Sequence, residues 1–333
     1  MKHNAFSTKI LSTENKGKIQ NSGVCGSKKG IFDLRAYLEI IYFCGMIRRG
    51  FLTLCAILAT LAVFAQGDNT TASRGSRTVD TLDGLVLRTM TFDGSQVFGS
   101  NQAVFILEVQ RSSGYSLRFA HEERRTPTSA MALKNGAAAA VNGSFFDMEQ
   151  HFPICHLRID GVDKGENTPG KDTVNRKYYQ YGAICIEGDS VFIVKTDSSR
   201  RWEETLPFSN VMTAGPLLIK DHVRQPLRGD RTFVTKRHNR TALGILDSGD
   251  VLLVVADGRF RQAEGLTLFE LQEFMETLGC RDAINLDGGG STTLFLNAGG
   301  RRGVANHPSD NGRFDHYGER PVSNAIMVVK KQP

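Results

Sequence analysis

The chain has 333 residues, of which 40% are hydrophobic and 23% charged, and this is the composition of an ordinary globular protein. The formal net charge is +6, but residues 1–65 hold nine Lys/Arg and three Asp/Glu, so the rest of the chain is formally neutral. A nucleic-acid or anionic-membrane partner requires a basic surface, for which this neutral remainder gives no support. We therefore predict no nucleic-acid partner.

Residues 46–65 have the pattern of a secretory signal peptide. Two arginines follow Met46, an apolar run occupies residues 51–64, and Ala65 stands at the expected cleavage site. The run is too short for a comfortable transmembrane span, so we predict a secreted or periplasmic protein with no stable membrane insertion after cleavage. A signal that starts at an internal methionine suggests that residues 1–45 are a non-native upstream extension. Residues 66–80 are small and polar and predict a flexible N-terminus.

Three cysteines remain beyond the leader, and an odd number allows at most one intramolecular disulfide. Cys155 with Cys185 is the predicted pair, since the two lie near one another in the chain and export favours oxidation. No CxxC or His/Cys cluster is present, so a structural zinc site has no support.

Strand patterns dominate the remaining sequence, in chain order at residues 85–92, 103–109, 115–119, 137–141, 183–186, 190–194, 211–219, 241–246, 251–255 and 322–329. A short helix is expected between Thr126 and Gly136. A longer helix begins at Thr267, with Glu270 completing a capping box, and ends at Gly279. Residues 161–178 predict a loop, which either covers the site or is a solvated insertion. We predict one α+β domain over residues 81–333, with a large mixed, mostly antiparallel β-sheet core packed by a few helices.

The stretch at residues 283–296, AINLDGGGSTTLFL, reads as strand, tight loop and strand. Consecutive glycines are costly to order, so a chain keeps them where the backbone needs positive φ or close contact with another group. Asp287 offers a carboxylate, and the hydroxyls that follow offer donors. A glycine-rich hairpin whose Asp only caps the turn remains an equal alternative.

Three further polar clusters lie at predicted strand ends, at residues 142–147, 238–241 and 257–259. Each one has a plain structural explanation as a turn or a surface charge. Strand ends on one sheet edge are a common place for a binding site, and the joint occurrence of the four clusters favours that reading.

The motifs VNGSFF, AGPLL, HNRTALGI, VVADGR, G.TL.EL and NLDGGGSTT occur here in the order seen in the phosphodiester glycosidase family, which the chain resembles from about residue 137 to its end. Asn239 departs from a Pro that often stands there, and Ser144 from a common Gly. The resemblance implies hydrolysis of a bond between the anomeric carbon of a sugar, N-acetylglucosamine-like, and a phosphodiester. Free sugar and a phosphomonoester would be released.

Cleavage at an anomeric carbon commonly uses two carboxyl groups, and charge stabilisation of a phosphate leaving group suits arginine and backbone amides. We predict Asp287 as the carboxylate nearest the anomeric centre and Asp257 as the second. Arg240 is the predicted phosphate clamp, and Asn142 a donor to sugar or phosphate. Further substrate-binding candidates are the amide cradle and its neighbours: Thr241, Arg259, Gly288, Gly289, Gly290, Ser291 and Thr292.

Two other classes of function stay open. A metal-dependent phosphoesterase would use Asp257 and Asp287 to hold a divalent cation, and a non-catalytic carbohydrate-binding module would keep the site without turnover. We predict no required cofactor and no catalytic metal, with a structural divalent cation as a possibility. The sequons at Asn142 and Asn239 lie inside site motifs, and this favours a bacterial exported enzyme.

Overall fold

The computed structural model describes residues 75–168, 178–197, 199–227 and 231–331. The predicted upstream extension and signal peptide lie outside this part of the chain, and so does most of the predicted flexible N-terminus. Residues 169–177 of the predicted loop lie outside it as well. No helix of the described part is long and apolar enough to cross a membrane.

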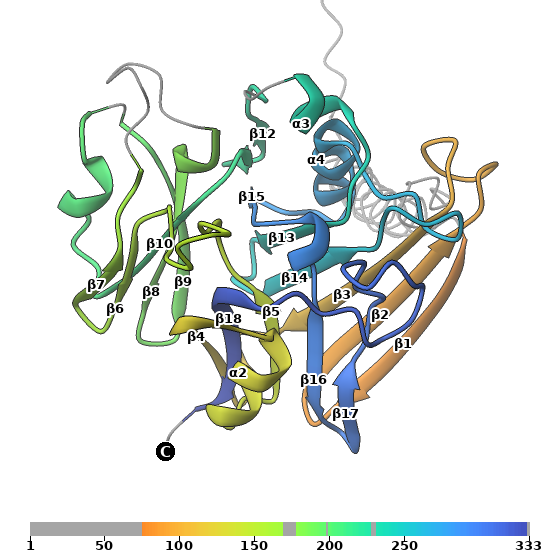
Figure 1. The fold of residues 1–333 in the computed structure, drawn as a ribbon, viewed down its shortest axis with the longest axis horizontal. Helices are drawn as coiled ribbons and strands as arrows, with labels where there is room; N and C mark the ends of the chain where they lie inside the picture. Colours follow the sequence, from red (N-terminus) through yellow and green to blue (C-terminus); the bar gives the residue numbers. More distant parts are fainter. Residues whose placement is uncertain (1–74, 169–177, 198, 228–230, 332–333) are drawn as a thin grey trace, which may run out of the picture. The chain divides into compact units, whose positions relative to one another are not determined.

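Three antiparallel sheets form the domain, and this confirms the predicted α+β class with a mostly antiparallel core (Figure 1). The largest sheet has eight strands, in the order β1 (Ser76–Leu82), β2 (Leu85–Phe92), β3 (Gln102–Val109), β14 (Val251–Ala256), β13 (Arg240–Ile245), β15 (Asp282–Asn285), β11 (Leu217–Lys220) and β12 (Val223–Arg224).

The two smaller sheets have five strands each. One follows the order β17 (Arg301–Val304), β16 (Leu294–Ala298), β5 (Ala139–Asn142), β18 (Val322–Lys330) and β4 (Tyr115–Thr126). The other follows the order β7 (Val162–Gly165), β6 (Leu157–Ile159), β10 (Asn210–Ala214), β8 (Gly182–Glu187) and β9 (Ser190–Lys195). The helices among the described residues are α2 (Thr128–Lys134), α3 (Arg231–Thr235) and α4 (Leu268–Thr277), with 3-10 turns η2 (Tyr178–Gln180), η3 (Trp202–Thr205) and η4 (Gly289–Ser291).

The centre of the eight-stranded sheet is buried on both faces. Every residue of β13 and β14 is buried, and alternate residues contribute to two different hydrophobic clusters. Leu243 and Leu253 pack into the core shared by the three sheets, whereas Ala242 and Leu252 face the cluster that contains α4. This period of two is the geometry of a strand, and it explains why both strands read as continuous apolar runs.

Helix α4 covers the outer face as the sequence predicts. Thr267 and Glu270 form the capping box, with both reciprocal hydrogen bonds present. Phe274 and Met275 are buried on the sheet side. A Cβ on Gly244 of β13 would come within 2.7 Å of Met275 and closer still to the Cys280 sulfur, so a glycine is needed there for the helix to approach.

Strand register places four chain segments at one edge of the eight-stranded sheet. Arg240 at the start of β13 pairs with Ala256 at the end of β14, and Asn285 at the end of β15 pairs with Ala242. Leu217 at the start of β11 pairs with Ile284. Since all these pairings are antiparallel, the ends of β14 and β15 and the starts of β13 and β11 lie side by side.

Residues 76–80, the last part of the predicted flexible N-terminus, belong to β1, an edge strand whose residues are mostly exposed and which pairs with β2. Several local predictions were wrong. The predicted strand at 211–219 is two strands in different sheets, β10 and β11, separated at the cis Gly215–Pro216 bond. The segment predicted as loop contains β7. The segment from 283 to 296 is not a hairpin, because β15 and β16 lie in different sheets.

The predicted disulfide is also absent: Cys155, Cys185 and Cys280 are buried thiols. The Cys155 Sγ donates to the carbonyl of Tyr179 at 3.6 Å, whereas Cys185 packs in the cluster around Trp202, so the two sulfurs have different neighbours. Burial raises the pKa of each of the three thiols to about 12. The reactive thiolate is therefore scarce at neutral pH.

Candidate active site

The Asp287 loop joins two sheets and is fixed on both sides. Figure 1 shows η4 between the end of β15 and the start of β16. The Asp287 N–H donates to the Gly143 carbonyl at 3.1 Å, and the Asn142 Nδ2 donates to the Asp287 carbonyl at 2.7 Å. The Asn142 Oδ1 accepts from the Thr241 hydroxyl at 2.8 Å and from the Thr293 N–H at 3.2 Å.

These contacts change two predicted roles. Asn142 and Thr241 are 0% exposed, and their side chains bind one another and the loop. They position Asp287 and are not the predicted donors to substrate. Asn239 is also 0% exposed, so neither sequon is accessible in the folded protein.

The three glycines admit close neighbours from other segments. A Cβ on Gly288 would lie 2.7 Å from the Asn239 carbonyl oxygen, and one on Gly289 would lie 2.7 Å from the Arg259 Nη2. A Cβ on Gly290 would come even closer to the Arg320 Nη2. Gly289 also has φ +62°, in the left-handed region. The glycine run is thus required for two guanidinium groups to rest on the loop backbone.

The predicted amide cradle is only partly available. The Gly288 N–H donates to the Asp287 Oδ1 at 2.9 Å, and the Gly289 N–H donates to the Asn239 carbonyl at 2.9 Å. Gly290 is the one member of the run whose N–H makes no hydrogen bond with the described residues. Gly290 is itself buried, so the loop does not present the predicted cradle of three amides.

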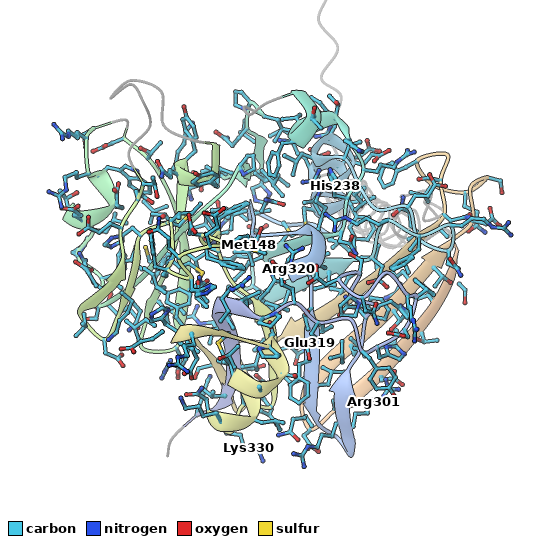
Figure 2. All side chains as sticks on the ribbon, viewed as in Figure 1. Met148, His238, Arg301, Glu319, Arg320 and Lys330 are labelled. Carbon is cyan, nitrogen blue, oxygen red and sulfur yellow. The ribbon has the colours of Figure 1, made fainter. Side chains whose placement is uncertain are left out.

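Two arginines lie against this loop. Arg259 is exposed and Arg320 keeps 23% of its side chain exposed, so a ligand can reach both. Arg320 lies beside η4 (Figure 2), and its Nε and Nη2 donate to the Asp310 Oδ1 at 3.0 and 2.6 Å. Burial and the charge of Arg320 lower the pKa of Arg259. Adjacent guanidiniums repel one another, and a bound phosphate relieves that repulsion.

Asp287 lies partly exposed beside these arginines. Burial raises the pKa of its carboxyl to about 6, against the lowering effects of the Ser291 hydroxyl, the Gly288 N–H and the two arginines. The Ser291 hydroxyl is near enough for this effect but makes no hydrogen bond of good geometry. Among the residues that the structure describes, the buried hydroxyls of Thr292 and Thr293 also have no hydrogen-bond partner. A carboxyl with a pKa near neutrality can act as either acid or base.

Arg240, the predicted phosphate clamp, is instead buried in the fold at 3% exposure. Its Nε donates to the Leu266 carbonyl at 2.9 Å, and its Nη2 donates to the carbonyls of Phe233 and Lys236 at 2.9 and 3.0 Å. The guanidinium carbon also lies 5.1 Å from the centre of the Phe233 ring. Arg240 therefore holds three backbone segments together.

We expect the Arg240→Met variant to lose about 3–5 kcal/mol of unfolding free energy, because the buried guanidinium makes three hydrogen bonds to backbone carbonyls that the variant cannot make. A urea titration of the variant against the wild type measures the change. Arg301→Met, an exposed arginine paired with Asp80, is the matched control and should stay within about 0.5 kcal/mol. An Arg240→Met protein of normal stability that no longer binds phosphate would restore the clamp role.

Asp257, the predicted second carboxylate, is 0% exposed and cannot touch a substrate in this conformation. Its Oδ1 accepts from the Asn306 Nδ2 and the His307 N–H, both at 3.0 Å, and its Oδ2 lies 2.7 Å from the His307 Nδ1. Burial raises the pKa of Asp257, and His307 opposes that rise. The carboxylate ties residues 306–307 to the end of β14, two residues before Arg259, and so positions the arginine.

The predicted and observed sites overlap only in part. Asp287, Arg259, Gly288 and Gly289 are brought together and are at least partly accessible. The other candidates are buried: Asn142, Arg240, Thr241, Asp257, Gly290, Ser291 and Thr292. Arg320 was missed because no motif surrounds it. Within the described residues, no group of three or more His, Cys, Asp or Glu side chains could hold a metal ion.

Comparison with known proteins identifies relatives of the chain. Residues 135–329 match the family model for the phosphodiester glycosidases. N-acetylglucosamine-1-phosphodiester alpha-N-acetylglucosaminidase from Mus musculus is 30% identical over 225 residues, and the Bos taurus protein is 28% identical over 221. Each alignment covers 62% of this chain, which spans only 40% and 39% of those two proteins.

Two solved structures share the fold. The zebrafish catalytic domain of the same enzyme, described as auto-inhibited by its pro-peptide, superposes with a TM-score of 0.57 at 19% identity, over 76% of this chain and 88% of that one. A hypothetical protein from Synechocystis gives a TM-score of 0.53 at 17% identity, over 77% of this chain and 64% of that one. The family model spans well over half of the chain, and the chain therefore belongs to the phosphodiester glycosidase family.

Proposed function

We propose that the protein hydrolyses the bond between the anomeric carbon of a sugar and a phosphodiester, and that it works outside the cytoplasm. The observation that carries this proposal is the meeting of Asp287, Arg259 and Arg320 on one glycine loop. One partly buried carboxyl stands beside two accessible cations. A substrate with a phosphate attached to the carbon under attack would match that arrangement. The relatives' names support an N-acetylglucosamine-like sugar.

In this mechanism the two arginines bind the phosphate and stabilise the negative charge that it gains as the bond to the sugar breaks. The Asp287 carboxylate faces the anomeric carbon, where positive charge develops in an oxocarbenium-like transition state. A phosphomonoester is a weak base and leaves without strong protonation. Water supplies the hydroxyl of the released sugar, and its proton is lost to solvent or to Asp287.

The test is incubation of the purified protein with UDP-N-acetylglucosamine and with a simpler N-acetylglucosamine-1-phosphodiester, in water enriched in oxygen-18. Products alone do not settle the bond, because cleavage on either side of the bridging oxygen can release free sugar. Label in the C1 hydroxyl of the sugar is expected for cleavage at the anomeric carbon. Label in the phosphate would establish phosphorus–oxygen cleavage and favour the phosphoesterase alternative. Absence of product from both substrates would leave a binding module or a different sugar.

Removal of divalent cations should leave the activity within about two-fold. Both Asp257 oxygens already accept hydrogen bonds from residues 306–307, and Asp287 faces two guanidiniums, so the pair is a poor cation site. Activity is measured after dialysis against EDTA and again after addition of Mg²⁺, Ca²⁺ or Zn²⁺. Loss of activity that one cation restores would revive the metal-dependent alternative.

A further inference from the structure

His238 is a partly exposed histidine that the proposed mechanism does not use (Figure 2). Its backbone is fixed, because its N–H donates to the Leu266 carbonyl at 3.2 Å and its carbonyl accepts from the Leu266 N–H at 3.0 Å. Its imidazole makes no hydrogen bond with any residue that the structure describes. A ring with free nitrogens at a fixed backbone position is available to a ligand. The nearest cationic site is that of Arg259 and Arg320, which we call the anion site.

The backbone at His238 lies against both segments that surround the anion site. A Cβ on Gly258, the residue before Arg259, would lie 2.7 Å from the His238 carbonyl carbon. The carbonyl of the next residue, Asn239, accepts from the Gly289 N–H at 2.9 Å. His238 therefore stands where the turn that carries Arg259 meets the glycine loop.

The neighbouring charges keep this imidazole neutral. The charges that act on it come from three segments and are all positive: Arg240, Arg259 and Lys236. Burial and these charges lower the pKa of His238 to about 4, so the ring is uncharged at pH 7 in the free protein. Two acids on adjoining segments, Glu264 and Glu270, pair with Arg237 instead.

A bound tetrahedral anion reverses this balance. Its negative charge at Arg259 opposes the positive field at His238, so the imidazole can take a proton from solvent and donate a hydrogen bond to an anion oxygen. The proton returns to solvent when the anion leaves. A phosphodiester carries one negative charge, whereas a phosphomonoester carries about two at neutral pH, so the product holds the proton more firmly than the substrate.

Resting on the anion site of the proposed function, we propose that His238 is its third, proton-coupled member. The imidazole is neutral in the free protein, becomes protonated as a tetrahedral dianion binds, and then holds that anion together with Arg259 and Arg320. The third cation is thus present only when there is an anion to bind. Acid pH strengthens binding of the phosphomonoester product and slows its release.

The test is a calorimetric titration with sodium sulfate at pH 6 and constant ionic strength, in two buffers with different enthalpies of ionisation. Sulfate stays a dianion in this range, so any proton taken up belongs to the protein. Asp287 can also gain a proton, and Asp287→Asn is therefore the reference. The reference should take up at least about 0.5 proton per sulfate, and Asp287→Asn/His238→Gln less than about 0.1. Sulfate should bind the reference at least about 10-fold more weakly at pH 8 than at pH 5, and the double variant should lose most of this dependence.

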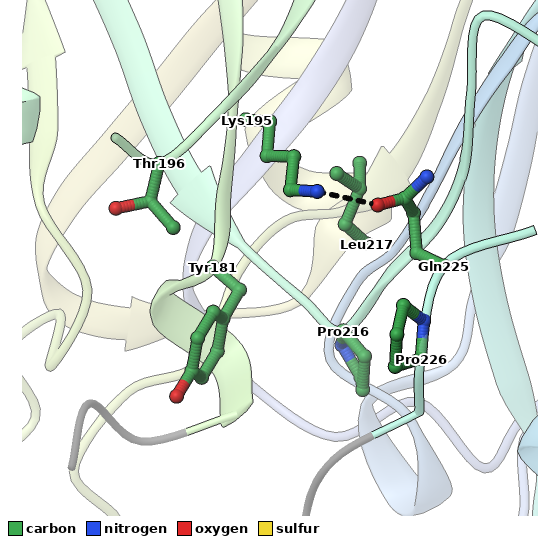
Figure 3. Close-up of a pocket in the computed structure, with 7 residues that line it drawn as sticks. All are labelled: Tyr181, Lys195, Thr196, Pro216, Leu217, Gln225 and Pro226. Atoms are coloured by element: carbon green, nitrogen blue, oxygen red, sulfur yellow. Dashed lines mark hydrogen bonds between the residues drawn. The ribbon is translucent and has the colours of Figure 1, made fainter. Parts of the chain in front are cut away.

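Two control variants, both made in the Asp287→Asn protein, remove a histidine or a cation elsewhere. His222→Gln removes an exposed histidine that pairs with Asp247. Lys195→Met removes an ammonium group that lines a separate cavity of about 250 Å³, where it donates to the Gln225 Oε1 at 2.8 Å (Figure 3). Both should bind sulfate with the proton uptake of the reference. Weaker sulfate binding by the Lys195→Met variant would place the anion in that cavity and overturn the proposal.

NMR of the imidazole nitrogens tests the same ring in the wild-type protein, with signals assigned by their loss in His238→Gln. They should titrate near pH 4 without sulfate and at about pH 6 or above with it. Unchanged titration, absence of sulfate binding, or proton uptake that survives in Asp287→Asn/His238→Gln would overturn the proposal. The expected uptake in a protein that turns over no substrate would support His238 and remove only the proposed function. Turnover without proton uptake would do the reverse.

Discussion

The Asp287→Asn variant should lose at least about 10³-fold in kcat, equivalent to about 4 kcal/mol of transition-state stabilisation, with little change in fold. The amide keeps the hydrogen-bonding shape of the loop but cannot carry the negative charge opposite the anomeric carbon. Asp247→Asn, an exposed aspartate that pairs with His222, is the matched control and should retain wild-type activity. Near-normal turnover by a folded Asp287→Asn protein would remove the carboxylate from the mechanism.

The pH dependence of this variant follows from the raised pKa. Asp287 in the wild type is ionised only above about pH 6, so kcat/KM should rise with pH through that value, and the limb should be missing in the Asn variant. The folded-state pKa lies above the ordinary value, so the folded state prefers the protonated acid. This group's stabilising contribution is present below about pH 4 and is lost as the pH rises through 6. Asp287→Asn should therefore be at least as stable as the wild type at pH 7. Thermal unfolding of both proteins at about pH 4 and at pH 7 measures this difference.

Replacing Arg259 or Arg320 with Met should each reduce kcat/KM by about 10²–10³-fold, because each guanidinium stabilises charge on the departing phosphate. Inorganic phosphate should also become a weaker inhibitor of both variants. The two arginines act on one anion, so the double variant should lose less than the product of the two single effects. Measuring kcat/KM for the two single variants and the double variant gives the coupling energy between the two arginines.

Arg301→Met again serves as the control, because this arginine pairs with Asp80 on the surface. Full phosphate inhibition in both arginine variants would place the anion elsewhere. Arg320→Met carries one complication, since Asp310 would lose its partner beside the loop. The variant Asp310→Asn separates the two effects, because it weakens the hold on Arg320 while the cation stays.

Short-range sequence patterns predicted much of the fold. The hairpins of β8 with β9 and of β13 with β14 follow from apolar runs that flank short polar turns, and the α4 capping box lies where Thr267 and Glu270 predict it. Strand β1 could not be found this way. It pairs with β2 through its backbone and buries only Leu82, so its side chains show no alternating apolar pattern. The assignment of β15 and β16 to separate sheets is likewise a long-range property.

The residues of the site also divide into those that local sequence predicts and those that depend on long-range packing. Asp287 and its glycines could be identified from the sequence, since three consecutive glycines are kept only where another group approaches the backbone closely. Local sequence does not determine where a guanidinium group points. Arg240 and Arg259 both belong to short polar clusters at strand ends, yet Arg240 is buried against carbonyl groups and Arg259 is exposed. The partners of Asp257 lie fifty residues further along the chain. These contacts depend on packing between distant segments.

The Asp287 loop is also the mechanical link between the eight-stranded sheet and the sheet that contains β16. Asn142 reaches it from the second of these sheets, and Thr241 reaches Asn142 from the first. Any change that alters how the two sheets dock will move the carboxylate relative to the arginines, even when it lies far from both. Core substitutions in either sheet will then look like catalytic defects in an assay, and activity becomes a sensitive reporter of domain assembly.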